Sequence, residues 1–250
     1  MIERSISVVI PTCDRLNLLK KSLESVSRQN LKPNEIIVVN NGKEKFCKSD
    51  LEFTQNIKLY NIDKYVGPAT ARNYGYNKAS SKYIAFLDDD DTWSNNYIED
   101  FVNNIDNYYD CYLARSKTIV NNEIVDYKNP KNKISLQYLF LNNPGIGGSN
   151  IIFKKNINYK KDIFDKTLCP AEDKALIIDL LLNNKKIKIL ENCFTIYNSD
   201  KSDNKRLSNS KNILVNKKNF YKKYKNFMKL TTKLKFLKKY LKIYLLNKIK

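Results

Sequence analysis

The stretch YIAFLDDDDTW, residues 83–93, combines a strand pattern with a cluster of acids. Tyr83–Leu87 form a continuous apolar run, which is typical of a strand buried on both faces, and four carboxylates follow where that strand ends. Similar apolar runs lie upstream at 7–10 and 35–39, with leucines at helical spacing between them. Strands that alternate with helices predict an α/β fold, with a mostly parallel sheet and helices on both faces.

Weaker patterns predict further elements around these strands. Asp14 stands where its side chain can cap a helix that starts near Leu16, and Gly67-Pro68 opens a second helix that runs to about Ala79. The other expected elements are strands at 57–60 and 111–114, helices at 95–105 and 171–182, and a flexible turn at 145–149.

The composition excludes several classes of chemistry. The 250 residues are 42% apolar and contain no histidine, which removes Ser-His-Asp and Cys-His catalysis and His-liganded metals. The five cysteines form no C-x-x-C pair, which argues against a disulfide framework and favours a reducing cytosol. No signal peptide, membrane span, P-loop or dinucleotide fingerprint is expected, since none of the corresponding patterns occurs.

The net charge of +19 is concentrated at one end of the chain. Residues 205–250 carry 16 Lys or Arg and no acid, so residues 1–204 hold 29 basic against 26 acidic groups, a net charge of +3. We therefore expect one domain at 1–200 and a separate basic tail at 205–250.

The tail also carries an apolar stripe, which predicts one or two basic amphipathic helices. Such a stripe can pack on the body of the protein, lie on an anionic membrane, or accompany a basic arm on nucleic acid. Packing alone does not explain the absence of acids, so we expect peripheral attachment to an anionic membrane surface and no nucleic-acid partner. The stripe consists of Phe220, Tyr224, Phe227, Leu230, Leu234, Leu237, Leu241 and Tyr244.

Polar groups gather at the expected carboxyl ends of the strands, where ligands bind in open parallel sheets. Asp88–Asp91 have the hard oxygen donors that suit Mg²⁺ or Mn²⁺, although an acidic run can also be a solvated loop. Thr12 to Arg15 and Asn40-Asn41 would line the same edge, with turn formation as the alternative. Arg72 could neutralise a phosphate or simply be an exposed helix arginine.

The order and spacing of these motifs resemble those of family 2 glycosyltransferases with a GT-A fold. The resemblance rests on SVVIPTCDR (7–15), IIVVNNG (36–42) and GPATARNYGYNKASSKYIAFLDDDDTW (67–93), and covers about residues 5–95. The shorter segments GIGGSNIIFKK (145–155) and AEDKALIIDLLL (171–182) extend it to about 185 with less specificity.

The resemblance implies roles for individual residues. Asp88 and Asp90 would be the outer carboxylates of a D-x-D motif that binds Mn²⁺ or Mg²⁺, with Asp90 as the direct ligand and Asp89 near the ribose. Asp173 would be the general base, with the adjacent Glu172 as its rival. The nucleotide-sugar site would also include Thr12, Asp14, Asn41 and Arg72, and the acceptor side Trp93, Gly148 and Ser149. Asn41 departs from the family, which often has Asp in a DDGS-type turn.

The activity implied is metal-dependent, inverting transfer of a hexose from a nucleoside-diphosphate sugar, UDP-linked, to a glycan or lipid-linked acceptor. The setting would be bacterial surface polysaccharide or lipooligosaccharide synthesis, at the inner face of the cytoplasmic membrane. Residues 1–95 would form the nucleotide-sugar half and 96–200 the acceptor half. Two alternatives stay open: a sugar nucleotidyltransferase, although PTCDR lacks the glycines such enzymes use, and a non-enzymatic basic adaptor.

Overall fold

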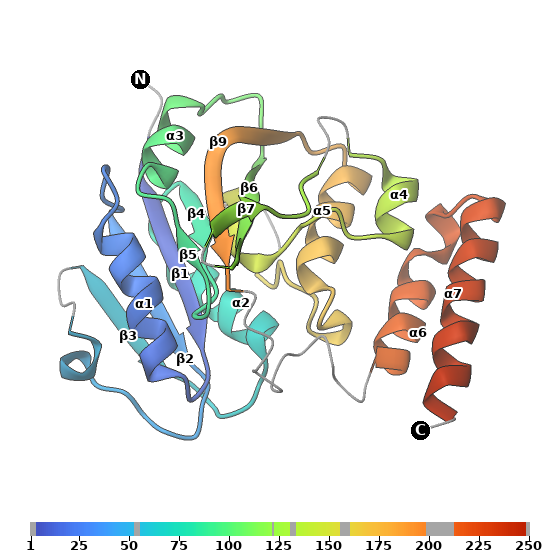
Figure 1. Ribbon diagram of the computed structural model, residues 1–250, viewed down its shortest axis with the longest axis horizontal. Helices are drawn as coiled ribbons and strands as arrows, with labels where there is room; N and C mark the ends of the chain where they lie inside the picture. The colour runs from blue at the N-terminus through green and yellow to red at the C-terminus, as the bar shows by residue number, and fades with distance from the viewer. Residues whose placement is uncertain are drawn as a thin grey trace.

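One sheet runs through the centre of the computed structural model, which describes residues 4–52, 56–121, 123–130, 134–155, 161–198 and 213–248 (Figure 1). Its first half is parallel, in the order β3-β2-β1-β4. These strands are β1 (Ile6–Thr12), β2 (Glu35–Asn40), β3 (Ile57–Asn61) and β4 (Tyr83–Phe86).

The second half of the sheet continues from β4 through β8, β6, β9 and β5. Here β8 is antiparallel to β4 and β6, whereas β6 and β9 are parallel, with a register shift between Ala114 and Arg115. The hairpin strand β7 pairs only with β6 among the described strands. The bounds are β5 (Thr92–Trp93), β6 (Cys111–Val120), β7 (Glu123–Asp126), β8 (Ile151–Lys154) and β9 (Ile187–Tyr197).

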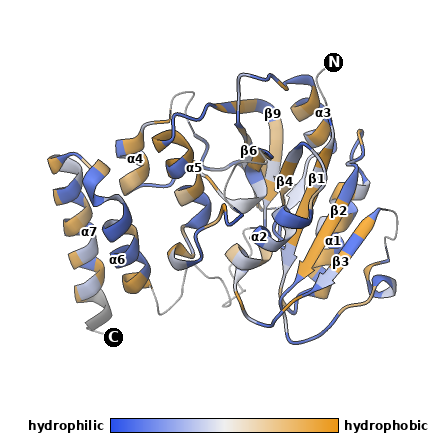
Figure 2. Cartoon of the chain, turned by 180° about the vertical axis from the view of Figure 1, so that it is seen from behind, coloured by the Kyte–Doolittle hydropathy of each residue, from blue (hydrophilic) through white to orange (hydrophobic). Residues whose placement is uncertain are grey.

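Alternate residues of the central strands bury on opposite faces of the sheet. Val8 and Ile10 pack in one apolar cluster with α1 and α3, whereas Val9 packs in the other with α2, α4 and α5. Figure 2 shows β1 and β2 as hydrophobic along their length, as expected when both faces are covered. The helices are α1 (Leu16–Ser27), α2 (Pro68–Lys78), α3 (Tyr97–Asn103), α4 (Leu136–Leu141) and α5 (Glu172–Leu182).

The expected α/β fold with a mostly parallel sheet between helices is confirmed, and one local expectation is wrong. Asp14 does not cap α1, because Arg15 occupies the N-cap position and no side chain there accepts a capping hydrogen bond. Asp14 instead has a φ of 54° and accepts a hydrogen bond from the Glu44 backbone N–H at 3.0 Å. No helix in the described part of the chain is both long and apolar enough to cross a membrane.

The C-terminal helices α6 (Ile213–Tyr224) and α7 (Leu230–Lys248) form a hairpin against the side of α4 and α5, at the right of Figure 1. Phe220 and Phe236 stack on each other in the main apolar cluster, and Tyr224 lies beside Phe140 of α4. Part of the expected tail stripe therefore packs on the body. Residues 205–212 and the side chains of 246–250 lie outside what the structure describes.

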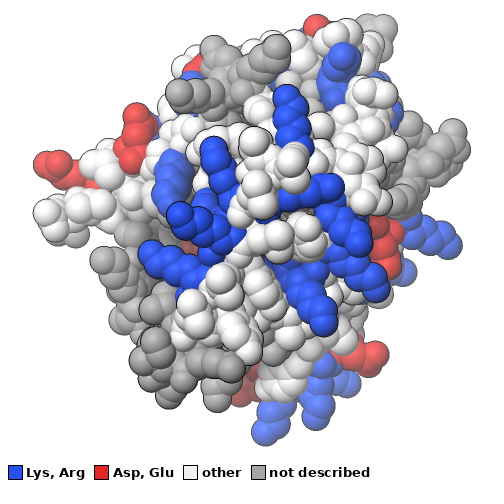
Figure 3. All heavy atoms as spheres, turned by 90° about the vertical axis from the view of Figure 1, so that its right-hand side faces the viewer, with Lys and Arg blue, Asp and Glu red and all other residues white. Residues whose placement is uncertain are grey.

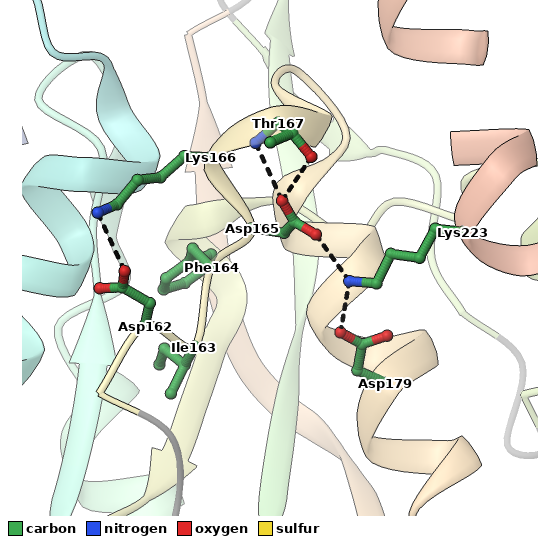
Figure 4. A pocket seen from close by; sticks show the side chains of 8 residues that line it. All are labelled: Asp162, Ile163, Phe164, Asp165, Lys166, Thr167, Asp179 and Lys223. Carbon is green, nitrogen blue, oxygen red and sulfur yellow. Dashed lines mark hydrogen bonds and ion pairs between the residues drawn. The ribbon is translucent and has the colours of Figure 1, made fainter. Parts of the chain in front are cut away.

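Polar contacts add to this attachment (Figure 4). Lys223 of α6 reaches Asp165 at 2.8 Å and Asp179 of α5 at 2.9 Å, across a pocket of about 270 Å³. The Tyr224 hydroxyl donates to Asp179 at 2.7 Å. These contacts join α6 to α5 and to Asp165, which precedes the 3₁₀ turn at Lys166–Leu168, so they hold the tail hairpin on the body.

Candidate active site

The carboxyl ends of β1, β2 and β4 open onto one cleft of about 690 Å³. Thr12, Cys13 and Arg15 line it together with Asp88–Asp91, and the first turns of α2 and α5 also contribute. The opposite wall comes from the loop at 143–148, from Thr118 of β6, from Tyr127 and Lys128 just after β7, and from the end of β9. The structure thus brings together segments that are up to about 180 residues apart, as open parallel sheets do at such edges.

The four consecutive acids alternate between the cleft and the interior. The side chains of Asp88 and Asp90 are 24% and 31% exposed, whereas that of Asp89 is fully buried. Asp91 is buried as well. The run is therefore not a solvated loop, because its second and fourth carboxylates are buried and only its first and third are partly exposed at the cleft.

Asp89 fastens the end of β1 to the end of β4. Its carboxylate accepts a hydrogen bond from the Thr12 hydroxyl at 2.6 Å and forms an ion pair with Arg15. Arg15 also bonds Asp90 at 3.1 Å. Burial raises the pKa of Asp89 to about 7, even though Arg15 and Thr12 favour the charged form. Contact between Asp89 and a ribose stays a prediction.

Asp91 ties β4 to the opposite wall. It accepts from the Ser149 hydroxyl at 2.5 Å and from the Asn198 backbone N–H at 3.3 Å. Burial, with Asp90 and Asp88 nearby, raises its pKa well above the usual value. Ser149 therefore supports the wall from behind rather than facing the cleft.

Arg72 of α2 is buried and connects the acid run to α5. Its guanidinium donates to Asp88 at 2.6 Å and to Glu172 at 3.0 Å. The alternative of an exposed helix arginine is therefore wrong. Gly148 lies against the same guanidinium, and a Cβ at that position would come within 2.6 Å of it, so only glycine fits without displacing Arg72.

Glu172 and Asp173 are adjacent at the start of α5 but have different surroundings. Glu172 is buried in the ion pair with Arg72, whereas Asp173 is partly exposed at the cleft. Burial and the neighbouring Glu172 charge raise the pKa of Asp173 to about 7. A carboxylate with that pKa can accept a proton near neutral pH, so the geometry favours Asp173 over Glu172 as a base.

Two of the expected nucleoside contacts also hold the loops together. The Asn41 side chain sits between the Thr12 carbonyl oxygen (2.7 Å) and the Gly67 N–H (3.1 Å), and its amide satisfies both when the nitrogen faces Thr12. Asp14 lies exposed at the rim, where it accepts from the Tyr65 hydroxyl at 3.2 Å. Their contact with a nucleoside stays a prediction.

Trp93, expected on the acceptor side, is buried behind the cleft wall. Its ring stacks on Tyr97 with 4.0 Å between centroids, and its indole N–H donates to the Ser149 carbonyl at 2.9 Å. Of the three residues expected on the acceptor side, only Gly148 lines the cleft itself. Trp93 and Ser149 can thus influence an acceptor only through the wall that they support.

Several residues that line the cleft carried no sequence signal of their own. They are Tyr65, Tyr127, Lys128, Pro170, Tyr197 and Asn198. The ring centroids of Tyr127 and Tyr197 lie 5.5 Å apart in the lining of the cleft. A Cβ at Gly147 would come within 2.0 Å of the Tyr197 hydroxyl, which explains the second glycine of the GIGGS turn.

Comparison with known proteins identifies the family. A family model described as glycosyl transferase family 2 matches residues 7–161. The Escherichia coli UDP-Glc:alpha-D-GlcNAc-diphosphoundecaprenol beta-1,3-glucosyltransferase WfgD is 30% identical over 72% of this chain and 70% of its own. The chain belongs to glycosyltransferase family 2. The resemblance seen in its motifs is therefore confirmed.

One further relative is matched over a small part of its own length, and one solved structure is similar in fold. An uncharacterised glycosyltransferase of Rickettsia bellii is 41% identical over 39% of this chain, which spans only 14% of that protein. A crystal structure of S. aureus TarS in complex with UDP-GlcNAc matches 95% of this chain and 71% of its own with a TM-score of 0.68, at 20% identity. The match to TarS confirms the GT-A fold of this family 2 chain.

The residues of this family 2 chain fit a divalent cation only together with a substrate. Among the described residues, no cluster of three or more His, Cys, Asp or Glu side chains could hold a metal ion by itself. Asp88 and Asp90 offer two oxygen donors at the cleft, and Mg²⁺ in nucleotide sites takes one or two carboxylates with phosphate oxygens completing the shell. The pair fits Mg²⁺ or Mn²⁺ that arrives with a diphosphate.

Proposed function

We propose that this family 2 protein is a metal-dependent, inverting hexosyltransferase that uses a nucleoside-diphosphate sugar. The observation that carries the proposal is the alternation of the acid run. Asp88 and Asp90 face the cleft between two arginines, and Asp173 faces the same cleft from α5. Cationic groups for a diphosphate and a carboxylate base for an acceptor thus share one space.

Different side chains of the cleft would carry out the proton transfer and the stabilisation of charge. Asp173 removes the proton of the acceptor hydroxyl while the hydroxyl oxygen attacks the anomeric carbon of the donor sugar. The bond between that carbon and the diphosphate breaks as the new bond forms. Arg15 and Arg72 lie where they neutralise the departing phosphate charge, and they keep their own charge because each is paired with carboxylates. A cation held by Asp88 and Asp90 would supply further charge stabilisation there. A single displacement inverts the anomeric configuration.

The names of the relatives support a substrate class for the proposed activity. WfgD is named for transfer from UDP-glucose to a diphosphoundecaprenol-linked sugar, and TarS was crystallised with UDP-GlcNAc. We infer a UDP-sugar donor and a glycan or lipid-linked acceptor in surface polysaccharide or lipooligosaccharide synthesis, at the inner face of the cytoplasmic membrane. We also propose residues 1–95 as the nucleotide-sugar half, 96–200 as the acceptor half and 205–250 as a separate tail.

The test is calorimetric binding of UDP, with GDP and TDP as controls, in the presence of Mn²⁺, of Mg²⁺ and of a chelator. We expect UDP to bind with a metal, and the Asp90→Ala variant to lose that binding. Asp162→Ala is the matched control, because Asp162 is exposed in the pocket beside α6 and pairs only with Lys166 among its described ion pairs. Equal binding of UDP to wild type and Asp90→Ala would contradict the donor site and favour the non-enzymatic adaptor.

A further inference from the structure

The apolar side chains of the tail are divided between two faces in the folded protein. Phe220, Tyr224 and Phe236 are buried against the body or each other. Leu230, Leu234 and Leu241, by contrast, are 73%, 59% and 55% exposed. Packing on the body therefore accounts for Phe220, Tyr224 and Phe236, and it leaves the leucines of α7 uncovered, together with Phe227 and Tyr244.

The exposed leucines form one continuous face of α7. Leu230, Leu234, Leu237 and Leu241 follow each other at intervals of four, three and four residues, the spacing that places side chains on one side of an α-helix. Thr232 and Phe236, which are buried, lie on nearly the opposite side. We call the four leucines the outer face of α7.

Lysines surround this face without acids to balance them. Lys235, Lys238 and Lys242 are exposed on α7 beside the leucines, and no Asp or Glu occurs in residues 205–250. Figure 3 shows the corresponding side of the molecule, with many lysines and arginines among uncharged atoms and only a few acids toward its margin. A partner of this surface must accept apolar side chains and supply negative charge.

We propose that the outer face of α7 lies on an anionic lipid bilayer, with its leucines at the boundary of headgroups and acyl chains and its lysines at the lipid phosphates. An interfacial helix of this kind pairs an apolar face with flanking cations. A second copy of the chain fits less well, since pairing two outer faces would bring two sets of lysines together. Nucleic acid would use the lysines and leave the leucines exposed to water. The assignment rests on the proposed location at the membrane and is independent of the transfer chemistry.

The attachment of α7 connects this surface to the active-site cleft. Lys239 donates to the Leu141 carbonyl at 3.1 Å and to the Asn142 side chain at 3.0 Å, at the end of α4. Of the residues that follow, Asn143 and Gly145–Gly148 line one wall of the cleft. A bilayer under α7 would therefore lie at a fixed position relative to that wall, as transfer to a lipid-linked acceptor requires.

The experiment measures binding of the full chain to vesicles by co-sedimentation. One set of vesicles contains phosphatidylglycerol and phosphatidylethanolamine, and the other contains phosphatidylcholine alone. We expect binding to the anionic set, and a fall of about tenfold or more in the partition coefficient for the double variant Leu234→Ser/Leu241→Ser. Leu31→Ser, at an exposed leucine remote from the tail, should bind like wild type.

A second pair of variants tests the charge. Lys238→Gln/Lys242→Gln should weaken binding to anionic vesicles by about threefold to tenfold, because two of the cations beside the outer face are removed. Lys21→Gln/Lys48→Gln removes the same charge from exposed positions on the body and should bind like wild type. Calorimetric UDP binding should be unchanged in all these variants, so failure of the donor site and failure of the lipid surface are separately visible.

Three results would overturn the proposal. The first is equal vesicle binding by wild type and the leucine variant. The second is a wild-type dimer in light scattering that the leucine variant converts to monomer, with no vesicle binding, which would assign the face to a second copy. The third is binding of RNA that needs the lysines and not the leucines, again without vesicle binding.

Discussion

Asp173 and Glu172 are neighbours with the same charge, and only one of them is available to a substrate. Glu172 holds Arg72, whereas Asp173 faces the cleft. We expect Asp173→Asn to lower kcat by about a thousandfold, within the range of a general base, while UDP binding changes little. Steady-state transfer assays and calorimetry on the same preparations measure both. If UDP binding fell as strongly as kcat, Asp173 would be part of the donor site rather than the base.

Glu172→Gln is the informative contrast to that variant. It removes one partner of a buried ion pair and leaves the Arg72 charge less balanced, which costs about 3 kcal/mol or more of stability. Thermal unfolding should therefore show a lower Tm for Glu172→Gln and little change for Asp173→Asn. The reverse order of the two Tm values would mean that the rival assignment of the base is right.

The pH dependence of transfer should report the same carboxyl group. Burial and Glu172 raise the pKa of Asp173 to about 7, and a base works only when deprotonated. The value of kcat/KM should therefore be constant above that pH and fall about tenfold per unit below it. A pH–rate profile measures this, with Asp126→Asn, an exposed position on β7, as the control. A profile that stays flat down to pH 5 would exclude a base of raised pKa.

At the scale of single elements, Glu35 shows how a strand end is fixed. It accepts hydrogen bonds from the Ser7 hydroxyl at 2.6 Å and the Ser80 N–H at 2.6 Å and pairs with Lys58, linking β1, β2 and β3 to the turn before β4. Burial opposes the charge, but these contacts hold the pKa of Glu35 at about 2. Its stabilising effect is therefore complete above about pH 4.5 and lost as the pH falls toward 2.

Glu35→Gln should lower the free energy of unfolding at pH 7 by about 2 kcal/mol, because a carboxylate with several donors is replaced by a neutral amide. Urea unfolding between pH 7 and pH 2 measures the effect, and the difference from wild type should shrink toward the acid end. Glu123→Gln on β7 is the control, since Glu123 is exposed. A difference that stays constant with pH would show that the charge of Glu35 does not matter.

The elements that sequence patterns predict are those whose burial is simple. Ile36–Val39 and Tyr83–Leu87 are buried on both faces of the sheet, so their apolar runs are unbroken. The strand β9 escaped prediction because Lys188, Glu191 and Asn192 interrupt it where it is partly exposed, next to the register shift opposite Ala114. A two-residue strand such as β5 has no pattern at all.

The residues of the site also include some that sequence patterns predict and some that they do not. The acids after β4 were predictable, because a strand end in a parallel sheet is a place of known chemistry. The pattern of residues alone does not say which of the four face the cleft, and only the family resemblance pointed to Asp88 and Asp90. In the structure the choice depends on contacts that Arg15, Ser149 and Asn198 make from distant segments. The Asp14 cap failed for a similar reason, because the Glu44 N–H competes for its carboxylate.

At the scale of the whole molecule, the tail has an inner side that stabilises the fold and an outer side that does not. Phe220→Ser/Phe236→Ser removes two stacked rings from the apolar cluster and should cost about 4 kcal/mol or more, a drop in Tm of about 8–16 °C. Leu234→Ser/Leu241→Ser should leave Tm within about 2 °C of wild type, because exposed substitutions change stability little. Calorimetric scans compare them, and equal losses in both would mean that the outer face is covered by protein.

Because the positive charge is concentrated in the tail, we expect the rate of transfer to a membrane-bound acceptor to depend on salt. Residues 1–204 carry a net charge of +3, so most of the +19 belongs to the tail, whose helices α6 and α7 lie at one end of the molecule (Figure 1). Raising NaCl from about 0.01 M to about 0.15 M shortens the screening length from about 30 Å to about 8 Å. Transfer to a lipid-linked acceptor in anionic vesicles should then fall by about tenfold, while transfer to a water-soluble acceptor should change by less than about twofold.

The comparison of the two acceptors locates the effect. The ion pairs of Arg15 and Arg72 are partly or wholly buried and are therefore screened weakly, whereas the lysines beside the outer face of α7 are exposed. An equal fall for both acceptors would place the salt sensitivity in the donor cleft instead. With the soluble acceptor unaffected, the same salt series on Lys238→Gln/Lys242→Gln should show a shallower slope than wild type, because fewer lipid-facing charges remain to be screened.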